Sequence, residues 1–277
     1  MLGAIEAGGT KFLCGVGTGP EDLQSIEIPT TTPDETLASV TAYFKQHHVS
    51  RIGLACFGPI DINRASPTYG HITNTPKLAW RNCNIVGHIE NELRLPIAFD
   101  TDVNAAAVAE STWGASQGLA NSVYFTVGTG IGGGAIIDGR LIHGKVHPEM
   151  GHILIRRHPA DIFVGICPSH HDCLEGLASG PAIETRWNQP PATLPTDHTA
   201  WDLEAYYLAQ AALSAAMLLS PDAIVFCGGV MQRPQLIAKI EVQLEALAAG
   251  YLSALPQLHQ SRLQHAGLLG ALLLAQR

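Results

Sequence analysis

SVYFTVGTGIGGGAII, residues 122–137, joins two apolar runs through a cluster of five glycines. The pattern predicts a strand, a glycine turn and a second strand. Glycine lacks the Cβ atom that blocks positive φ, so we expect this backbone to turn sharply and to point several N–H groups at one anion. The five glycines are Gly128, Gly130, Gly132, Gly133 and Gly134. Such a turn can hold a phosphate.

The same pattern occurs twice more in the chain. Residues 2–16 read LGAIEAGGTKFLCGV, and residues 224–231 read IVFCGGVM. A single glycine turn is as often structural as functional, because hairpins and bulges also need glycine. Three copies favour a nucleotide-binding protein. In the first copy, Lys11 fits a phosphate contact and a surface charge equally well.

Composition and charge exclude several classes of protein. The chain has 277 residues, is 46% hydrophobic and carries a formal charge of -8. This length suits two domains, and the lack of clustered Lys and Arg argues against nucleic acid as a partner. The apolar runs 211–219 and 268–275 are too short to cross a membrane, and Glu6 interrupts the N-terminal run before a signal sequence develops. We therefore expect a cytoplasmic protein, with its six cysteines as buried thiols and metal ligands.

Strand and helix patterns alternate along the chain, which predicts two α/β domains facing each other across a cleft. Helices are expected at about 32–47, 201–219 and 234–249. We place the boundary within 113–120, which gives domains 1–115 and 116–262, with a metal loop at 152–173. The tail helix, 263–277, has little polar surface, so either the first domain or a partner must cover it. A homodimer is expected on this ground.

Four residues in HPEMGH and CPSHHDC form the expected metal site: His152, Cys167, His170 and Cys173. The last three are three residues apart, and Pro168 favours a tight turn, so two thiolates and an imidazole can converge. Zinc takes this set as a closed Cys2His2 tetrahedron, which is structural rather than catalytic. His171 is an alternative to His170 as ligand, and a loop with incidental Cys and His is the less favoured interpretation. The second nitrogen of His152 would stay free to hydrogen-bond outward beside Glu149, a pair that suits a polyol.

Two carboxylates follow predicted strands at positions that suit chemistry. Asp102 lies between the short strand 97–99 and an Ala-rich helix, and open α/β sheets bind their ligands at such edges. Transfer of a phosphoryl group to an alcohol needs a carboxylate near the attacking hydroxyl, so Asp102 is the candidate general base, with a helix N-cap as the alternative. Glu6 precedes the first glycine turn and is a candidate Mg²⁺ ligand, directly or through water, or a solvated strand-end acid.

The motifs EAGGTK, TDVNAAAVAE, VGTGIGGG and HPEMGH, followed by the Cys/His loop, resemble the ROK family of sugar kinases and repressors over nearly the whole chain. The resemblance implies a two-domain actin-like ATPase fold of the ribonuclease H-like kind, ATP and Mg²⁺ in the interdomain cleft, and phosphorylation of a hexose. It also implies that Asp102 is the catalytic base and that the four metal residues bind zinc. Glu149, His152 and Glu175 match sugar-contacting positions.

Further binding residues carry over from the same resemblance. Asn74 and Thr75 lie in a stretch similar to the sugar loop of the family. The first phosphate loop is matched by Gly8, Gly9, Thr10 and Lys11, and the second by Thr129, Gly130 and Gly132. The region near adenosine is matched by Pro181, Gly228, Gly229, Val230 and Met231.

Two departures from the glucokinase pattern indicate the sugar. The chain has Glu6-Ala7 where ROK glucokinases have Asp-Ile, and CPSHHDCLEG where they have a Cys-x-Cys-Gly-x-x-Gly-Cys loop. Both variants are similar to the bacterial fructokinase branch, so we expect conversion of D-fructose to fructose 6-phosphate, with mannose or glucose as alternatives. A repressor of the family would carry a helix-turn-helix ahead of Glu6, for which we expect no room. A non-catalytic sugar-binding regulator is the other alternative.

Overall fold

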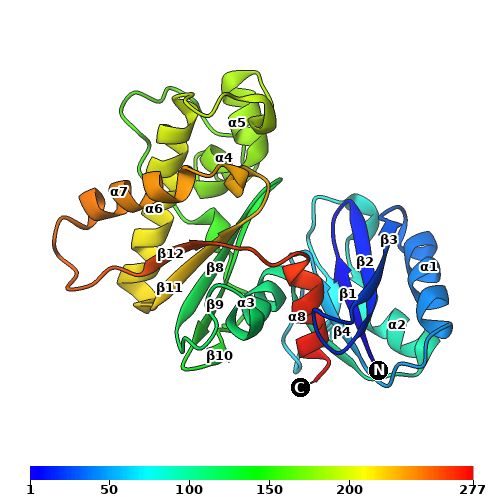
Figure 1. Cartoon of the computed structure of the whole chain (residues 1–277). Coiled ribbons are helices and arrows are strands. Elements are labelled where there is room, and N and C mark those ends of the chain that lie inside the picture. Colours follow the sequence, from blue (N-terminus) through cyan, green and yellow to red (C-terminus); the bar gives the residue numbers. More distant parts are fainter. Residues whose placement is uncertain (277) are drawn as a thin grey trace. The chain divides into compact units, whose positions relative to one another are not determined.

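The computed structural model describes residues 1–276, which form two compact units. The first unit contains residues 1–109, 143–148 and 263–276, and the second contains Glu110–Ile142 and Glu149–Arg262. Figure 1 shows the elements of each. The division falls three residues before the predicted boundary region. The sequence does not indicate that His143–Pro148 belongs to the first unit.

The first unit is built on a five-stranded sheet in the order β3-β2-β1-β4-β7. β1 and β2 form the antiparallel hairpin that the first glycine pattern predicts, whereas β1, β4 and β7 run parallel. The strands are β1 (Leu2–Ala7), β2 (Lys11–Gly17), β3 (Gln24–Pro29), β4 (Ile52–Cys56) and β7 (Ile97–Thr101). The three parallel strands end together, because Ala7 pairs with Cys56 and Cys56 with Thr101.

Helices cover both faces of this sheet. Gly3 faces Phe44 of α1 (Pro33–Lys45), and a Cβ on Gly3 would lie 2.9 Å from that ring. On the neighbouring strand β4, Gly3 pairs with Ile52, and the following residue, Gly53, faces the other side of the sheet. A Cβ on Gly53 would lie 1.8 Å from the Ala271 carbonyl oxygen of α8 (Ala266–Leu274). Successive residues of a strand point to opposite faces, so α1 and α8 lie on opposite sides (Figure 1). Glycine at 53 is required because α8 packs directly on the strand backbone.

Three further elements complete the first unit. α2 (Ile85–Leu93) packs beside α1, and a two-stranded ribbon of β5 (His71–Ile72) and β6 (Cys83–Asn84) precedes it. The one-turn helix η1 (Leu78–Trp80) lies between these short strands. α3 (Asp102–Trp113) begins in the first unit and ends in the second.

The second unit repeats the same strand pattern with a different sequence. Its sheet has the order β10-β9-β8-β11-β12, in which β8 and β9 form the hairpin predicted for residues 122–137, and β8, β11 and β12 run parallel. The strands are β8 (Ser122–Val127), β9 (Ile131–Ile137), β10 (Arg140–Leu141), β11 (Ala223–Cys227) and β12 (Gln257–Gln260). Two sheets of matching topology are what the resemblance to an actin-like fold implies.

The helices of the second unit pack around α6 (Ala200–Leu219), which contacts α4 (Leu174–Ala178) and α7 (Leu236–Ala248). α5 (Gly180–Trp187) follows α4, and single turns form η2 (Met150–His152), η3 (Pro191–Thr193) and η4 (Val230–Gln232). The core lies between these helices and the sheet, where Phe125 and Phe226 stack with ring centroids 5.7 Å apart. Residues 142–173 contain little regular structure, as their sequence predicts. None of the helices formed by residues 1–276 is long and apolar enough to cross a membrane.

Candidate active site

In the first unit, the glycine turn and Asp102 lie at the same edge of the sheet. The turn follows Ala7 at the end of β1, and Asp102 follows Thr101 at the end of β7. β4 lies between them with Cys56 in register with both strand ends. Neighbouring strands are about 4.8 Å apart, so the two strand ends are separated by about 10 Å. Open α/β sheets bind ligands at this carboxyl edge.

Asp102 is not needed as the cap of α3. The capping bond comes from Thr101, whose Oγ1 accepts from the Asn104 backbone N–H at 3.2 Å. The half-buried Asp102 is the first residue of the helix, and its Oδ1 accepts from Val103 N–H at 2.9 Å. The strand end and the helix start therefore place this carboxylate at the edge while another side chain does the capping.

A buried carboxylate two residues earlier was not found from the sequence. Asp100 is 5% exposed, and its Oδ1 accepts from Asn104 Nδ2 at 2.7 Å. Its Oδ2 lies 2.7 Å from His143 Nε2. This pair attaches residues 143–148 to the first unit. No spacing in the sequence marks His143, because it is 43 residues from its partner.

The first glycine turn is tight and is held by the end of β3. The Gly8 backbone N–H donates to the Lys11 carbonyl at 3.0 Å, and Thr30 Oγ1 donates to the Gly8 carbonyl at 2.8 Å. Thr30 N–H donates to the Thr10 carbonyl at 3.0 Å. Lys11, at the start of β2, pairs instead with exposed Glu27 on β3. Its ammonium is therefore engaged along the sheet surface.

Glu6 is half-buried, and its Oε2 is out of contact with solvent, which does not fit the alternative of a solvated strand-end acid. Its side chain lies against Gly267 and accepts a backbone hydrogen bond from Leu268, in the first turn of α8. Burial raises the pKa of Glu6, although that hydrogen bond and Lys11 oppose the shift. Its Oε2 is buried and has no hydrogen-bond partner among residues 1–276. One such oxygen fits a magnesium site only if phosphates and waters supply most of the ligands.

In the stretch that resembles a sugar loop, one residue is exposed to solvent and the next is buried. Asn74 is exposed, whereas Thr75 is 1% exposed. Thr75 Oγ1 accepts from Lys77 N–H at 3.4 Å, and its carbonyl accepts from Arg81 Nε at 2.7 Å. Thr75 thus shapes the loop from inside, which leaves Asn74 as the exposed polar side chain of the two.

In the second unit, the residues expected near ATP converge around the turn between β8 and β9. Gly180 N–H donates to the Gly128 carbonyl at 2.8 Å, which brings Pro181 and the start of α5 to the turn. A Cβ on Gly180 would lie 3.8 Å from Val230, and one on Gly228 would lie 2.3 Å from the Val127 carbonyl. Val230 and Met231 are buried in the core, so only their main chain is available to a ligand. Thr129 lies in the turn itself, and Gly132 pairs with Thr126 in the hairpin.

Gly130 and Gly133 of this turn serve close packing rather than positive φ, which corrects our expectation, whereas a Cβ on Gly128 would meet nothing within 4 Å. Within residues 1–276, no glycine from 128 to 134 has positive φ, whereas Gly228 has φ +101°. A Cβ on Gly130 would lie 2.7 Å from Glu175 Oε2, and one on Gly133 would lie 2.8 Å from the Met150 sulfur. The sequence pattern found the turn, but the neighbours that require glycine come from other segments.

Three of the five residues expected to bind sugar, Glu149, His152 and Glu175, meet beside this turn. Glu175 Oε2 accepts from Ile131 N–H at 2.9 Å, and its Oε1 lies 3.9 Å from His152 Nε2. Glu149 lies close enough for His152 and Glu175 to act on its charge. Burial raises the pKa of Glu149, an effect that His152 opposes and Glu175 reinforces. Two carboxylates and an imidazole offer a sugar both acceptors and a donor.

The four expected metal ligands also form a cluster. Their ligand atoms lie within 4.8 Å of one another. His152 Nδ1 lies 3.7 Å from Cys167 Sγ and 3.5 Å from Cys173 Sγ, and His170 Nδ1 lies 3.7 Å from Cys167 Sγ. A zinc tetrahedron with Zn–S of about 2.3 Å and Zn–N of about 2.0–2.1 Å separates sulfur and nitrogen ligands by about 3.5 Å. The donor set and its spacing therefore fit zinc, and His152 Nε2 remains directed toward Glu175.

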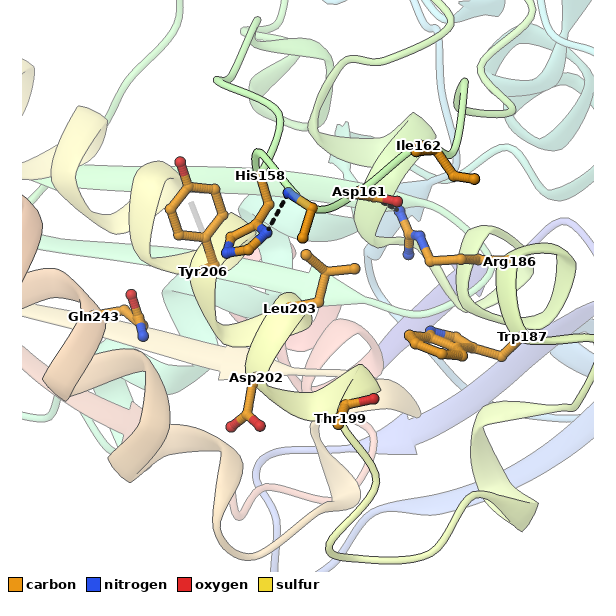
Figure 2. Close-up of a pocket in the computed structure, with 11 residues that line it drawn as sticks. His158, Asp161, Ile162, Arg186, Trp187, Thr199, Asp202, Leu203, Tyr206 and Gln243 are labelled. Atoms are coloured by element: carbon orange, nitrogen blue, oxygen red, sulfur yellow. Dashed lines mark hydrogen bonds and ion pairs between the residues drawn. The ribbon is translucent and has the colours of Figure 1, made fainter.

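A cavity of about 570 Å³ lies elsewhere in the second unit (Figure 2). Arg186 and Asp161 form a buried ion pair of 3.2 Å in its wall, and Tyr207 donates to the same carboxylate at 2.5 Å. His158 and Tyr206 meet edge to face at one end of the cavity, and Trp187 lies at the other. None of the residues predicted from the sequence to bind ATP, sugar or metal lines this cavity.

The family model for the ROK family matches residues 2–277. The chain belongs to the ROK family. It is similar to "Fructokinase" of Lactococcus lactis subsp. cremoris, with 46% identity over 252 residues, which cover 90% of this chain and 86% of the relative. It is 41% identical to "Fructokinase" of Pediococcus pentosaceus over 282 residues, which cover 100% of this chain and 98% of that one.

A solved relative shares the fold. The crystal structure of a ROK family glucokinase from Streptomyces griseus in complex with glucose and AMPPNP matches with a TM-score of 0.77 and 25% identity, covering 98% of each chain. This agreement along the full length confirms a mixed α/β chain with the two-domain actin-like ATPase fold that the resemblance implied.

Proposed function

We propose that this ROK protein is an ATP-dependent fructokinase that converts D-fructose to fructose 6-phosphate. The observation that carries the proposal is the identity of 41–46% with fructokinases over almost the entire chain. The geometry supports it, because the first glycine turn and the Asp102 carboxylate lie at the same end of the first sheet. No observation favours a repressor or a non-catalytic regulator.

In this proposal, Asp102 is the general base. It accepts the proton of the attacking sugar hydroxyl while the bond from that oxygen to the γ-phosphorus forms and the bond to the β–γ bridging oxygen breaks. Glu149, His152, Glu175 and Asn74 orient the sugar. The turns at Gly8–Thr10 and Gly128–Gly130 present backbone N–H groups to phosphates, and the main chain near Pro181 and Gly228 borders the adenosine. A cytoplasmic location accords with the use of ATP.

Two metals belong to the proposal. Zinc would be held by His152, Cys167, His170 and Cys173, and it would fix an irregular loop and the His152 ring rather than take part in the reaction. Magnesium would neutralise phosphate charge near the first glycine turn. Glu6, whose Oε2 has no hydrogen-bond partner among residues 1–276, would act on that ion directly or through water.

Replacement of Asp102 by Asn tests the chemical role. We expect D102N to bind fructose with unchanged affinity while kcat falls about 10²–10⁴-fold, the usual contribution of a general base. ADP release measured with fructose, mannose and glucose, together with equilibrium binding of fructose, gives both quantities. Turnover of D102N equal to that of the wild type would remove Asp102 from this role, and wild-type preference for another hexose would reject fructose as the substrate.

A further inference from the structure

Lys77 lies over the first glycine turn, although it comes from a distant segment. A Cβ placed on Gly9 would lie 2.6 Å from Lys77 Cε, 3.6 Å from Cδ and 3.7 Å from Nζ. The aliphatic stem of the lysine therefore crosses Gly9, and its ammonium is held within a few ångströms of the turn. Glycine at this position leaves the room that the stem occupies.

The backbone around Lys77 is anchored to the same hairpin. Lys77 N–H donates to Thr75 Oγ1 at 3.4 Å, and its carbonyl accepts from Trp80 N–H at 2.9 Å. Trp80 is 1% exposed, donates from Nε1 to the Thr31 carbonyl at 2.9 Å, and packs on Phe12 of β2 with ring centroids 5.3 Å apart. Phe12 directly follows Lys11, which ends the first glycine turn. The hairpin thus holds the segment that carries Lys77.

The charges around the turn distinguish Lys77 from Lys11. Lys11 stands next to the turn in sequence, but its ammonium pairs with Glu27 on the neighbouring strand. Lys77 is exposed, and no carboxylate within residues 1–276 forms an ion pair with it. Its charge is therefore available for an anion at the turn, where backbone N–H groups alone cannot neutralise several phosphate oxygens.

We propose that Lys77 is a catalytic residue that binds phosphate oxygens of ATP at the turn of Gly8, Gly9 and Thr10. This inference rests on the proposed kinase function. During transfer the sugar oxygen gains the γ-phosphoryl group, its proton passes to Asp102, and ADP leaves with the electrons of the broken P–O bond. Lys77 keeps its own protons and donates hydrogen bonds to the oxygens on which negative charge builds up.

The test compares K77M, K77R and K45M with the wild type. Methionine keeps the length and the apolar stem of the lysine but removes its charge, and arginine keeps the charge. Lys45 is the matched control, because it is an exposed lysine of the same unit that pairs with Glu92 on the surface. We expect kcat for fructose phosphorylation to fall about 10²-fold in K77M and to recover largely in K77R, with no change in K45M.

Binding measurements separate a phosphate contact from a structural role. K77M is expected to bind a non-hydrolysable ATP analogue about tenfold more weakly, a loss of about 1.4 kcal/mol. Its affinities for adenosine and fructose should stay unchanged, and so should its melting temperature. Equal losses of ATP-analogue and adenosine affinity, or a lowered melting temperature, would show that Lys77 only supports the fold and would overturn the proposal.

The outcome also separates this inference from the proposed function. A wild-type protein that phosphorylates fructose, together with a K77M variant as active as K45M, would overturn the role of Lys77 and leave the fructokinase intact. A wild-type protein without fructokinase activity would reject the proposed function. The comparison of ATP analogue with adenosine would then still decide whether Lys77 contacts phosphate.

Discussion

His152 has two ring nitrogens with different neighbours. Nδ1 lies among the cysteine sulfurs of the cluster, and Nε2 lies 3.9 Å from Glu175 Oε1. A metal on one nitrogen fixes the ring and thereby directs the other. Glu175 in turn accepts from the backbone of Ile131 beside the glycine turn. A single residue thus connects the proposed zinc to the carboxylates proposed to hold the sugar.

Replacement of Cys167 by Ser tests this connection. We expect C167S to lose its zinc and to raise KM for fructose about 10–100-fold, the effect typical of residues that orient a site through another group. Elemental analysis and steady-state kinetics measure the two effects. Cys83 is a suitable control, because it lies on β6 of the first unit outside the cluster, so C83S should keep both the metal and KM. Equal, negligible zinc in wild type and C167S would reject the metal site.

At the scale of elements, α6 contains a buried acid without a hydrogen-bond partner in the described chain. Glu204 is 1% exposed, and neither carboxylate oxygen has such a partner within residues 1–276. Burial raises the pKa of Glu204 well above its ordinary range, and the charge of Arg186 only partly opposes this. The helix therefore tolerates the acid in its neutral form.

The raised pKa gives a pH dependence of stability with a definite sign. The folded state binds the Glu204 proton more tightly than the unfolded chain does. The contribution of this proton to the free energy of unfolding is therefore complete below the unfolded pKa of about 4.3, and it is lost as the pH rises through the folded pKa. We expect E204Q to melt a few degrees above wild type at pH 8, and the two melting curves to converge at low pH; each kcal/mol shifts the melting temperature of a domain by about 2–4 °C.

The exposed Glu241 on α7 provides the matched control for this measurement. E241Q should follow the wild-type melting curve at every pH. A difference between E204Q and wild type that does not vary with pH would contradict the ionisation argument, because it would then reflect packing alone.

At the scale of the whole molecule, the tail helix no longer requires a partner. α8 packs on β1, β2 and β4 of its own chain, and most of its residues are buried there. The original reason for expecting a homodimer is therefore absent. Another remains, since Leu154, Ile162 and Val164 of the second unit are large apolar side chains with 68–93% exposure. A contiguous exposed apolar patch marks a contact site, and these three side chains come from one segment of eleven residues, 154–164.

A homodimer therefore stays a prediction, now placed on the second unit. Sedimentation velocity should show a species of twice the 29.4 kDa chain mass, and I162D should shift it toward the monomer. Leu218, at the end of α6, is 81% exposed and gives a control at a different surface. A wild-type monomer at tens of micromolar would rule out the dimer, and dissociation by L218D but not by I162D would place the interface elsewhere.

Local patterns were sufficient to predict several parts of this protein. Both glycine hairpins, the Thr32 cap and first-turn Pro33 of α1, and the irregular loop before Cys173 follow from short-range residue preferences. The spacing in CPSHHDC was likewise sufficient to group three of the four clustered metal ligands. Such features depend on residues within a few positions of one another, so the sequence alone contains their cause.

Other parts depended on contacts between distant segments, which only the tertiary structure decides. Asp100 meets His143 across 43 residues, the Glu6 side chain lies against a helix at the opposite end of the chain, and Lys77 reaches a turn formed 68 residues earlier. Positive φ was the wrong reason to expect glycine at positions 130 and 133, because Glu175 and Met150, rather than the backbone dihedral, exclude a Cβ there. The sequence by itself determined which residues could do the chemistry. Packing decided which of them meet, because burial and pairing depend on neighbours that no local pattern encodes.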